Sequence, residues 1–210
     1  MSKIAHKKRI ILGVTGASGA LFARRTLQIL EADPRVEKIH LVVSGSGVKL
    51  LRDELDLDIS KSAQIPSLLA ARTTRKTVYL RDSDIGASIA SGSYAVEGMV
   101  VMPCTTGCLA QIASGISDTL IERAADVCLK QRRQLILAVR DTPFNRIHLE
   151  NMLRAQLAGA VIFPIIPSYY DRPKTIDDLV TQFCCRVLAL LDLEQADQFR
   201  WQGEDKRPRK

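Results

Sequence analysis

A turn rich in glycine and hydroxyl groups near the start of the chain is suited to bind an anion. It spans Gly13–Ala20, follows the apolar run Ile10–Leu12 and precedes a helical pattern that opens at Leu21. Glycines let the backbone approach a ligand closely, the hydroxyls of Thr15 and Ser18 can donate hydrogen bonds, and a helix N-terminus adds N–H groups and a positive dipole. The segment predicts either a phosphate site or a tight strand-to-helix turn without a ligand.

The turn does not fit a pyridine-nucleotide site. The spacing G-x-G-x-x-G is absent, and the next apolar run ends at Ser44 rather than at an acidic residue that could bind a ribose. Tyr170 and Lys174 have the spacing of a short-chain dehydrogenase pair, but Pro173 lies between them and disfavours a helix there. We interpret that spacing as a coincidence.

Basic side chains could form a second anion site. Arg123 and Lys130 lie seven residues apart, which is two helical turns, so they share one face of a predicted helix. Arg186 lies between apolar neighbours in another predicted helix. Cations that converge from separate segments would suit phosphate, which Arg binds through paired hydrogen bonds. The alternative is that Arg123 and Lys130 pair with Glu122 or Asp126 at the surface.

The composition is that of a globular protein with an aliphatic core. The chain has 210 residues, of which 46% are hydrophobic and 5% aromatic, and its net charge is +7. The length fits one domain, and the charge suits anionic ligands. Nucleic acid is less favoured, because the basic residues are scattered and not interleaved with aromatics. We expect a single domain over residues 1–203 and a basic tail over residues 204–210.

The five cysteines are an odd number in apolar or helical contexts, which is typical of reduced thiols in a cytoplasmic protein. Cys104 and Cys108 lie four residues apart without an accompanying Cys or His pair, so a zinc site is disfavoured. No apolar run approaches the roughly 20 residues of a spanning helix. We expect a soluble, cytoplasmic protein that binds neither nucleic acid nor a membrane.

Apolar strand candidates alternate with helical patterns along the chain, and this alternation predicts an α/β fold with a doubly wound, mainly parallel sheet. Strands are expected at Ile10–Val14, Ile39–Val43, Met99–Pro103, Leu135–Val139 and Val161–Ile165, and Thr77–Leu80 is a candidate for a short one. Helices are expected at Leu21–Ala32, Ser46–Glu54, Asp118–Arg133, Ile147–Ala158 and Ile176–Leu191. The segment 55–97 is otherwise hard to place.

The carboxyl ends of the expected strands carry polar residues, and ligands of such sheets bind beyond these ends. Three ends offer small residues and hydroxyls, one offers an arginine next to a carboxylate, and the last offers two tyrosines and an arginine. These ends are Thr15–Ser18, Ser44, Cys104–Cys108, Arg140–Asp141 and Pro167–Arg172. The sequence therefore predicts a polar, partly cationic crevice at one edge of the sheet.

Eight motifs occur in order over almost the whole chain. They are GVTGASGA, SGS at 91–93, PCTTGCLA at 103–110, LIERAADVCLKQRR at 120–133, PF after Arg140–Thr142, IHLENML at 147–153, YYDRP at 169–173 and RWQG at 200–203. Taken together and in register, these motifs resemble the UbiX family of flavin prenyltransferases, which is related to phenylacrylic acid decarboxylase-like flavoproteins.

The resemblance implies a flavodoxin-like, Rossmann-type three-layer sandwich that binds reduced FMN. It implies transfer of a dimethylallyl group from dimethylallyl monophosphate to N5 of the flavin, ring closure at C6, and delivery of the prenylated FMN to a UbiD-type decarboxylase, often in ubiquinone biosynthesis. It further implies that no metal is needed, and that the chain forms a homododecamer built from trimers, with sites at subunit boundaries.

The resemblance also assigns residues. The FMN site would comprise Gly16, Ala17, Ser18, Ser44, Thr105, Thr106, Gly107, Cys108 and Arg140. The prenyl phosphate would be held by Lys130, Tyr170 and Arg186, with Arg123 nearby. Glu54 would lie near the reacting centre, Ser91–Ser93 against the substrates, and Trp201 over the site. Asp141 stands where the family usually has a glutamate that handles protons, and the loss of one methylene puts the rate in doubt more than the reaction type.

Other readings of the motifs remain open. An FMN-dependent cysteine decarboxylase of the same fold would have an active-site His and an Asn-containing PASANT-like segment, where this chain has PCTTGCLA and offers only His148. A non-catalytic flavodoxin-like electron carrier would tend to be acidic and to surround its flavin with aromatics, whereas this chain is basic. A direct decarboxylase of aromatic acids is a further alternative.

Overall fold

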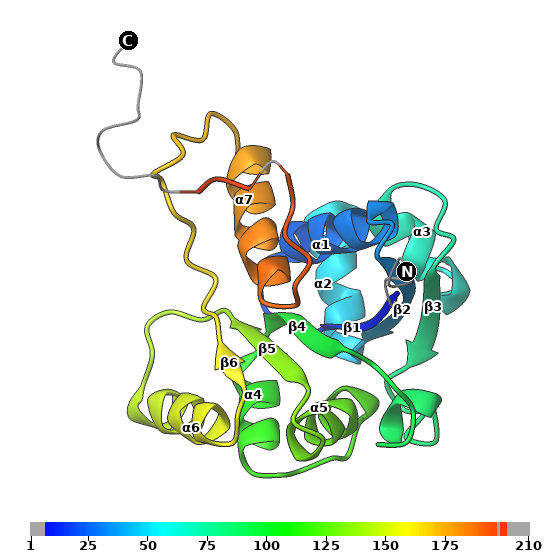
Figure 1. The fold of residues 1–210 in the computed structure, drawn as a ribbon, viewed down its shortest axis with the longest axis vertical. Coiled ribbons are helices and arrows are strands. Elements are labelled where there is room, and N and C mark those ends of the chain that lie inside the picture. Colours follow the sequence, from blue (N-terminus) through cyan, green and yellow to red (C-terminus); the bar gives the residue numbers. More distant parts are fainter. Residues whose placement is uncertain (1–6, 197, 201–210) are drawn as a thin grey trace, which may run out of the picture.

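The computed structural model describes residues 7–196 and 198–200, and these form a six-stranded parallel sheet between two layers of helices (Figure 1). The strands are β1 (Lys8–Val14), β2 (Val36–Val43), β3 (Thr77–Arg81), β4 (Gly98–Cys104), β5 (Gln134–Val139) and β6 (Val161–Ile162). Their order is β3-β2-β1-β4-β5-β6, and each neighbouring pair is parallel. This is the strand order of doubly wound Rossmann-type sheets, so the predicted fold is confirmed.

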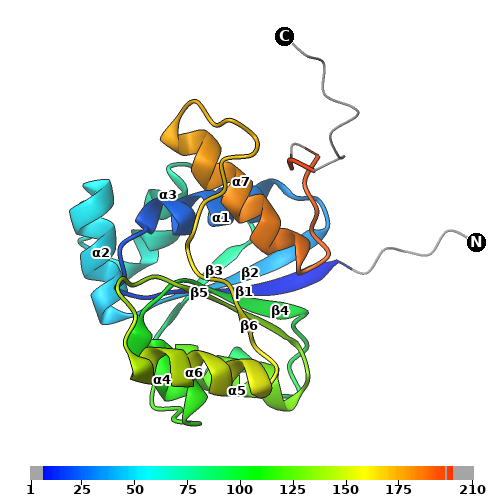
Figure 2. The same cartoon turned by 90° about the vertical axis from the view of Figure 1, so that its left-hand side faces the viewer.

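Each face of the sheet is covered by its own set of helices (Figure 2). One core contains residues of α1 (Ala20–Ala32), α2 (Gly45–Leu55), α3 (Ile65–Ala70) and α7 (Ile176–Ala189). The other contains residues of α4 (Thr106–Ala113), α5 (Leu120–Lys130) and α6 (Arg146–Leu157). Short 3-10 turns lie at Ser62–Gln64 and Ser88–Ala90. The sheet thus separates side chains of α7 from those of α5.

Continuous apolar runs form the central strands because both faces of the sheet are covered. All seven residues of β4 are buried, and the last five residues of β1 and of β2 are also buried. Capping boxes fix the starts of three helices: Thr119 with Glu122 at α5, Asn145 with His148 at α6, and Thr175 with Asp178 at α7. The starts of α5, α6 and α7 are therefore encoded locally.

The structure differs from the expected elements mainly in its short segments. The candidate strand at Thr77 is present as β3, but α3 and α4 were not expected. The last strand is shorter than predicted, although the backbone N–H groups of Phe163 and Ile165 still donate to β5, at 2.9 and 2.8 Å. Among the described residues no helix is long and apolar enough to cross a membrane. Trp201 and the tail 204–210 lie outside the described residues.

Candidate functional site

The turns after β1, β2 and β4 are joined into one unit at the carboxyl edge of the sheet. The backbone N–H of Ser44 donates to the carbonyl of Val14 at 3.0 Å. The hydroxyl of Thr15 donates to the carbonyl of Pro103 at 2.8 Å and accepts from the N–H of Thr105 at 2.8 Å. Thr15 is only 3% exposed, so its hydroxyl acts within the scaffold. The expected crevice therefore has a rigid floor.

Two glycines allow these turns to approach one another. A Cβ at Gly16 would lie 2.5 Å from the Cβ of Ser46, and a Cβ at Gly47 would lie 2.5 Å from the carbonyl oxygen of Val14. Real Cβ atoms do not make such contacts, so the first turn of α2 packs against the β1–α1 turn only because both positions lack a side chain. Close packing against Ser46 therefore explains why position 16 of the glycine-rich turn is a glycine.

A cavity of about 250 Å³ opens at this edge. Its walls include the hydroxyls of Ser44, Ser46, Thr105 and Thr119 and the carboxylates of Asp82 and Glu122. Of the residues expected at the FMN site, Ser44, Thr105, Gly107 and Cys108 line it. Thr106 is the first residue of α4, and Gly16, Ala17 and Ser18 belong to the adjoining turn.

Two helices direct their N-termini at the cavity. Ser44 is the N-cap of α2 and accepts a hydrogen bond from the N–H of Gly47 at 3.0 Å. Thr105 is the N-cap of α4 and accepts from the N–H of Cys108 at 3.1 Å. The other first-turn N–H groups of a helix cannot be satisfied by carbonyls of the same helix. With the positive ends of both dipoles, they make this side of the cavity favourable for an anion.

A third helix, α5, also begins at the cavity, but backbone N–H groups at its start already donate to carboxylates. Asp82 Oδ1 accepts from the N–H of Ile121 at 3.0 Å, and Glu122 Oε2 accepts from the N–H of Thr119 at 3.0 Å. Burial, with the nearby charge of Asp82, raises the pKa of Glu122, which is 4% exposed. This wall suits hydroxyl or N–H donors of a ligand, so the cavity has an anion-binding side and a donor-binding side.

The thiol of Cys108 completes the cavity as a neutral group. A hydrogen bond with Cys104 and burial hold the pKa of Cys108 well above its usual range. All five cysteines are buried, and none of them forms a disulfide. Among the residues described, no group of three or more His, Cys, Asp or Glu side chains gathers as a metal site would require.

The N-terminus of α1, where the sequence predicts a phosphate, is engaged by Glu54. Its Oε2 accepts from the N–H groups of Gly19 and Ala20 at 2.9 and 2.8 Å. Desolvation raises the pKa of Glu54, but these bonds, a hydrogen bond with Ser18 and the charge of Arg140 outweigh it and lower the pKa. The carboxylate is thus an internal anion at the glycine turn.

Arg140 and Asp141 follow β5 at the same edge. The N–H of Arg140 donates to the carbonyl of Cys104 at 3.1 Å, while its side chain remains exposed beside Glu54. The carboxylate of Asp141 accepts from the N–H of Thr142 at 2.8 Å and from the hydroxyl of Thr106 at 3.3 Å. Both carboxylates expected near the reacting centre therefore lie at the crevice.

The cations expected to hold the prenyl phosphate lie elsewhere. Lys130 ends α5 with its side chain exposed. The guanidinium of Arg123 donates to the carbonyl of Ala90 at 3.1 Å and pairs with Asp126 at 2.9 Å, as the alternative reading predicted for Arg123. Tight packing of Gly92 against the side chain of Gln131 brings the segment Ser91–Ser93 to the same end of α5.

Arg186 and Tyr170 belong to the opposite side of the sheet. Within the part of the chain that the structure describes, Arg186 has no buried anionic partner of the kind its apolar neighbours suggested. It is exposed on α7, with its Cζ 5.5 Å from the ring centre of Phe163. Tyr170, in the loop before α7, is 70% exposed. Because α5 and α7 cover opposite faces, Lys130 and Arg186 cannot meet within one chain. The expected convergence of cations is thus not seen in a single chain.

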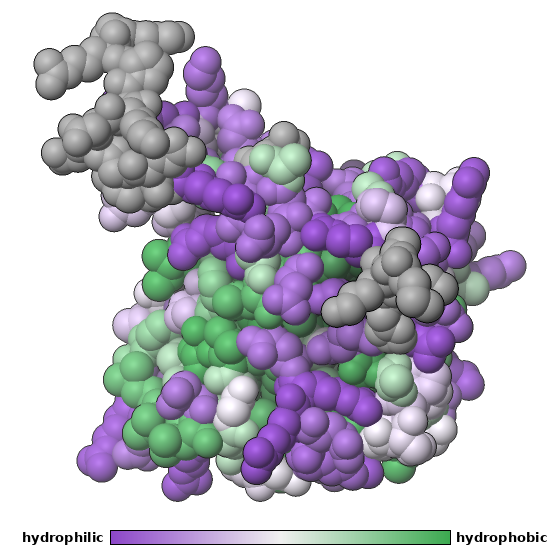
Figure 3. Space-filling model, in the orientation of Figure 1, coloured by the Kyte–Doolittle hydropathy of each residue, from purple (hydrophilic) through white to green (hydrophobic). Residues whose placement is uncertain are grey.

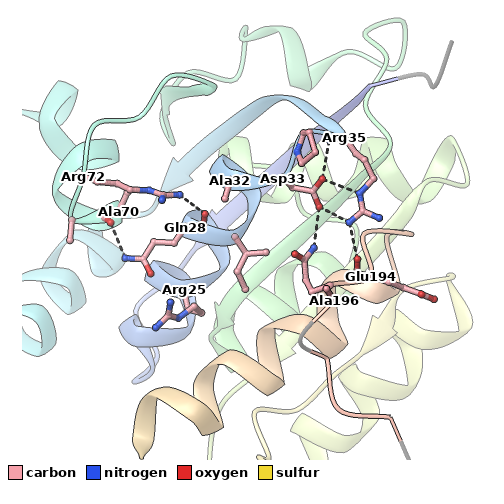
Figure 4. A pocket seen from close by; sticks show the side chains of 13 residues that line it. Arg25, Gln28, Ala32, Asp33, Arg35, Ala70, Arg72, Glu194 and Ala196 are labelled. Atoms are coloured by element: carbon pink, nitrogen blue, oxygen red, sulfur yellow. Dashed lines mark hydrogen bonds and ion pairs between the residues drawn. The ribbon is translucent and has the colours of Figure 1, made fainter.

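A larger hollow lies away from this edge, beside α1 (Figure 4). Its volume is about 690 Å³. Two of its arginines are paired with carboxylates: Arg35 binds Asp33 through two hydrogen bonds of 2.9 and 2.6 Å, and Arg25 pairs with Asp177. Arg72 donates to the carbonyl of Gln28 at 2.6 Å. Because two of its three arginines are already neutralised, this hollow offers little to an anion, and the smaller cavity at the strand ends is the better candidate.

The cavity residues that were missed from the sequence include Ser46, Asp82 and Glu122. Ser46 has a local signal, because it follows the N-cap Ser44 in a run of small residues. Glu122 was considered only as a surface partner of Arg123, although its place three residues after Thr119 is that of a capping box. Asp82 follows β3 in the segment 55–97, which sequence patterns do not place.

Comparison with known proteins identifies the family. The sequence model of the Flavoprotein family matches residues 2–187. The flavin prenyltransferase UbiX of Halalkalibacterium halodurans is 40% identical over 96% of this chain and 96% of its own, and the flavin prenyltransferase LpdB of Lactiplantibacillus plantarum is 41% identical over 94% of this chain and 100% of its own. The chain belongs to the UbiX-type flavin prenyltransferases.

Solved structures of this family have the same architecture. A UbiX protein in complex with FMN and dimethylallyl pyrophosphate has a TM-score of 0.84 and 40% identity, covering 95% of this chain and 100% of its own. A dodecameric FMN-dependent UbiX-like decarboxylase from Escherichia coli O157:H7 has a TM-score of 0.80 and 38% identity, covering 93% and 100%. An FMN-dependent cysteine decarboxylase is only 15% identical with a TM-score of 0.54, so it shares the fold alone.

Proposed function

We propose that this member of the UbiX family is a flavin prenyltransferase that transfers a dimethylallyl group from dimethylallyl monophosphate to reduced FMN. The observation that carries the proposal is the crevice itself: two helix N-termini, an arginine and two carboxylates meet at the carboxyl edge of a sheet whose relatives include a complex with FMN and dimethylallyl pyrophosphate. Because that complex contains the diphosphate, the choice of the monophosphate is part of the proposal.

The cavity at the crevice has room for only part of FMN. A cavity of about 250 Å³ is smaller than most small-molecule pockets, so it would take the phosphate and ribityl chain and leave the ring system outside. The N-termini of α2 and α4 would hold the phosphate, and Asp82 with Glu122 would accept from ribityl hydroxyls. The ring would then lie toward Ser18, Arg140 and Glu54.

When bound, reduced FMN supplies the N5 and C6 atoms that take up the dimethylallyl group, while the allylic C–O bond breaks with its electron pair on the phosphate. Fixed cations would stabilise the charge that grows on this phosphate, which is the role we assign to Lys130, Arg123 and Arg186. The ring of Tyr170 would lie beside the developing allylic cation. Glu54 and Asp141 would accept and return the protons that the two flavin positions give up.

These roles require neighbouring copies of the chain, because the sheet separates Lys130 from Arg186. We propose a homododecamer, the state of the related protein from Escherichia coli. Hydrophobic side chains gather where β6 and α6 lie (Figure 3). Four apolar residues of α6 are exposed: Ile147, Leu149, Leu153 and Leu157. Exposed apolar patches of this kind mark protein interfaces.

The product would serve a separate enzyme. A modified flavin is useful only when it is released to a protein that uses it, and we propose a UbiD-type decarboxylase in the cytoplasm as the recipient. The alternative of a cysteine decarboxylase is not favoured, since its representatives share only the fold with this chain.

Anaerobic incubation of the protein with reduced FMN and dimethylallyl monophosphate, followed by mass analysis of the flavin, tests the function. We expect a flavin heavier by one dimethylallyl unit, with inorganic phosphate released in equal amount. Parallel reactions with the diphosphate decide which donor is used. Binding of FMN without any heavier flavin from either donor would contradict the proposal and favour an electron carrier.

Mixed oligomers test the shared site. Lys130→Ala and Arg186→Ala should each lower prenylation far more than FMN affinity. After co-expression of the two variants, some sites receive both native cations from different copies, so part of the activity should return. If mixing restores nothing and each variant alone retains its turnover, these cations do not act on the prenyl phosphate.

A further inference from the structure

The segment Ala90–Tyr94 is held by two arginines through its backbone. Arg123 Nε donates to the carbonyl of Ala90 at 3.1 Å. Arg133 Nη2 donates to the carbonyl of Gly92 at 2.8 Å, and its Nη1 donates to the carbonyl of Tyr94 at 2.8 Å. Three alternate carbonyls are therefore bound by fixed cationic donors, which form shorter and stronger hydrogen bonds than neutral ones.

The end of α5 directs Arg133 at this segment. The N–H of Arg132 donates to the carbonyl of Leu129 at 3.0 Å, and that of Arg133 donates to the carbonyl of Cys128 at 2.8 Å. With Arg132 at a φ of 54°, this is the bond pattern of a Schellman motif, which reverses the chain at a helix end. Arg133 is thus turned back along α5, while the side chain of Arg132 is exposed.

The opposite side of the segment is fixed as well. The hydroxyl of Tyr94 lies 3.0 Å from Nε2 of His40, which is 3% exposed in the core. Between these anchors the hydroxyls of Ser91 and Ser93 are exposed and lie 2.9 Å apart. A backbone secured from both sides thus presents a pair of hydroxyls to solvent at the end of α5 that carries Lys130.

We infer that Arg133 is a positioning residue, whose paired hydrogen bonds to Gly92 and Tyr94 hold the hydroxyls of Ser91 and Ser93 in place for the phosphate of the prenyl donor. The inference rests on the proposed function for the identity of that ligand. The paired hydrogen bonds of Arg133 are observed in the chain itself and do not depend on which ligand binds. Arg133 would touch no substrate and would act only through the backbone that it binds.

Arg133→Met removes both hydrogen bonds with little change in length, and Arg133→Lys keeps the charge but not the planar pair of donors. Arg132→Asn is the matched control, because it removes an adjacent charge and Asn tolerates the left-handed conformation. Amide hydrogen exchange over residues 88–95 should be faster in Arg133→Met than in Arg132→Asn, whatever the protein does catalytically. Equal exchange in the two variants would overturn the inference.

The kinetic arm uses single turnovers with saturating reduced FMN. Displacement of a binding group by about 1 Å can cost up to 10²-fold, so Arg133→Met should raise the half-saturating concentration of dimethylallyl monophosphate by roughly 10- to 100-fold. FMN affinity should stay unchanged, and Arg133→Lys should recover part of the loss. A variant with a lower melting temperature but a wild-type half-saturating concentration would show a purely structural role.

Ser91→Ala tests whether Arg133 acts through the serine hydroxyls. If Arg133 acts through the serine hydroxyls, Ser91→Ala should add little to Arg133→Met, since coupled residues are not additive. Independent, multiplying effects would overturn the inference. If the wild-type protein makes no prenylated flavin but amide exchange over residues 88–95 is still faster in Arg133→Met, the proposed function is refuted. The role of Arg133 in holding the backbone at Gly92 and Tyr94 would then still stand.

Discussion

Asp141→Asn should separate proton transfer from scaffold stability. An amide oxygen can accept from the N–H of Thr142, as the carboxylate does at 2.8 Å, and the amide nitrogen can donate to the hydroxyl of Thr106. Both hydrogen bonds can therefore still form, although the hydroxyl of Thr106 accepts in the variant where it donates in the wild type. What is lost is a negative charge near the N-terminus of α4, which is worth about 0.3–1 kcal/mol. For a chain of this length the melting temperature should fall by about 1–4 °C.

A loss of this size leaves nearly all molecules folded, so it cannot explain a large fall in rate. If Asp141 handles a proton, single-turnover prenylation should slow by roughly 10²–10⁴, the usual contribution of a general acid or base. Asp141→Glu restores the residue that the family usually has and should be neutral or faster. Equal rates for Asp141→Asn and the wild type would refute this reasoning and leave Glu54 as the proton carrier.

Further variants test the scaffold around the site. Gly16→Ala should weaken FMN binding measured by titration, because its Cβ would lie 2.5 Å from that of Ser46, and adding Ser46→Gly should restore affinity. Glu54→Gln removes the negative charge at the start of α1 and should lower the unfolding free energy by about 1 kcal/mol in thermal melts. An unchanged melting temperature would show that this carboxylate does not stabilise the start of α1. Burial, helped by nearby positive charges, lowers the pKa of His40 from 6.5 to about 4. The unfolded chain therefore binds this proton first, and the unfolding free energy should fall by about 3 kcal/mol from pH 6.5 to pH 4, a slope that His40→Gln should flatten.

The fold could be predicted because buried parallel strands are continuous apolar runs, and the run Gly98–Cys104 is the plainest example. The helix Thr106–Ala113 was missed because its eight residues are too few for a clear periodicity and include a glycine. The cavity wall at Asp82 was missed for a different reason. Asp82 follows the short edge strand β3, whose side chains are exposed or only partly buried, so no long apolar run marks this strand in the sequence.

The cations show a limit of spacing arguments. Seven residues between Arg123 and Lys130 establish a shared helix face, and both residues do lie on α5. Spacing within a helix does not reveal which side of the sheet that helix covers. The crossovers that place α5 and α7 on opposite faces depend on the order of all six strands. Sequence patterns therefore identified residues suited to phosphate and could not show that one chain keeps them apart.

The glycine turn bears on where the flavin phosphate would bind. An anion does lie at the N-terminus of α1, but it is the carboxylate of Glu54. A phosphate in the same place would bring two negative charges within about 4 Å, which costs about 4 kcal/mol per pair of unit charges near a protein surface. Among the described residues, no carboxylate accepts a hydrogen bond from the first backbone N–H groups of α2 or α4. Asp141 lies near α4 but accepts from the hydroxyl of Thr106 instead. Electrostatics therefore favours the flavin phosphate there and leaves Glu54, beside Arg140, facing the end of the crevice where the chemistry is proposed.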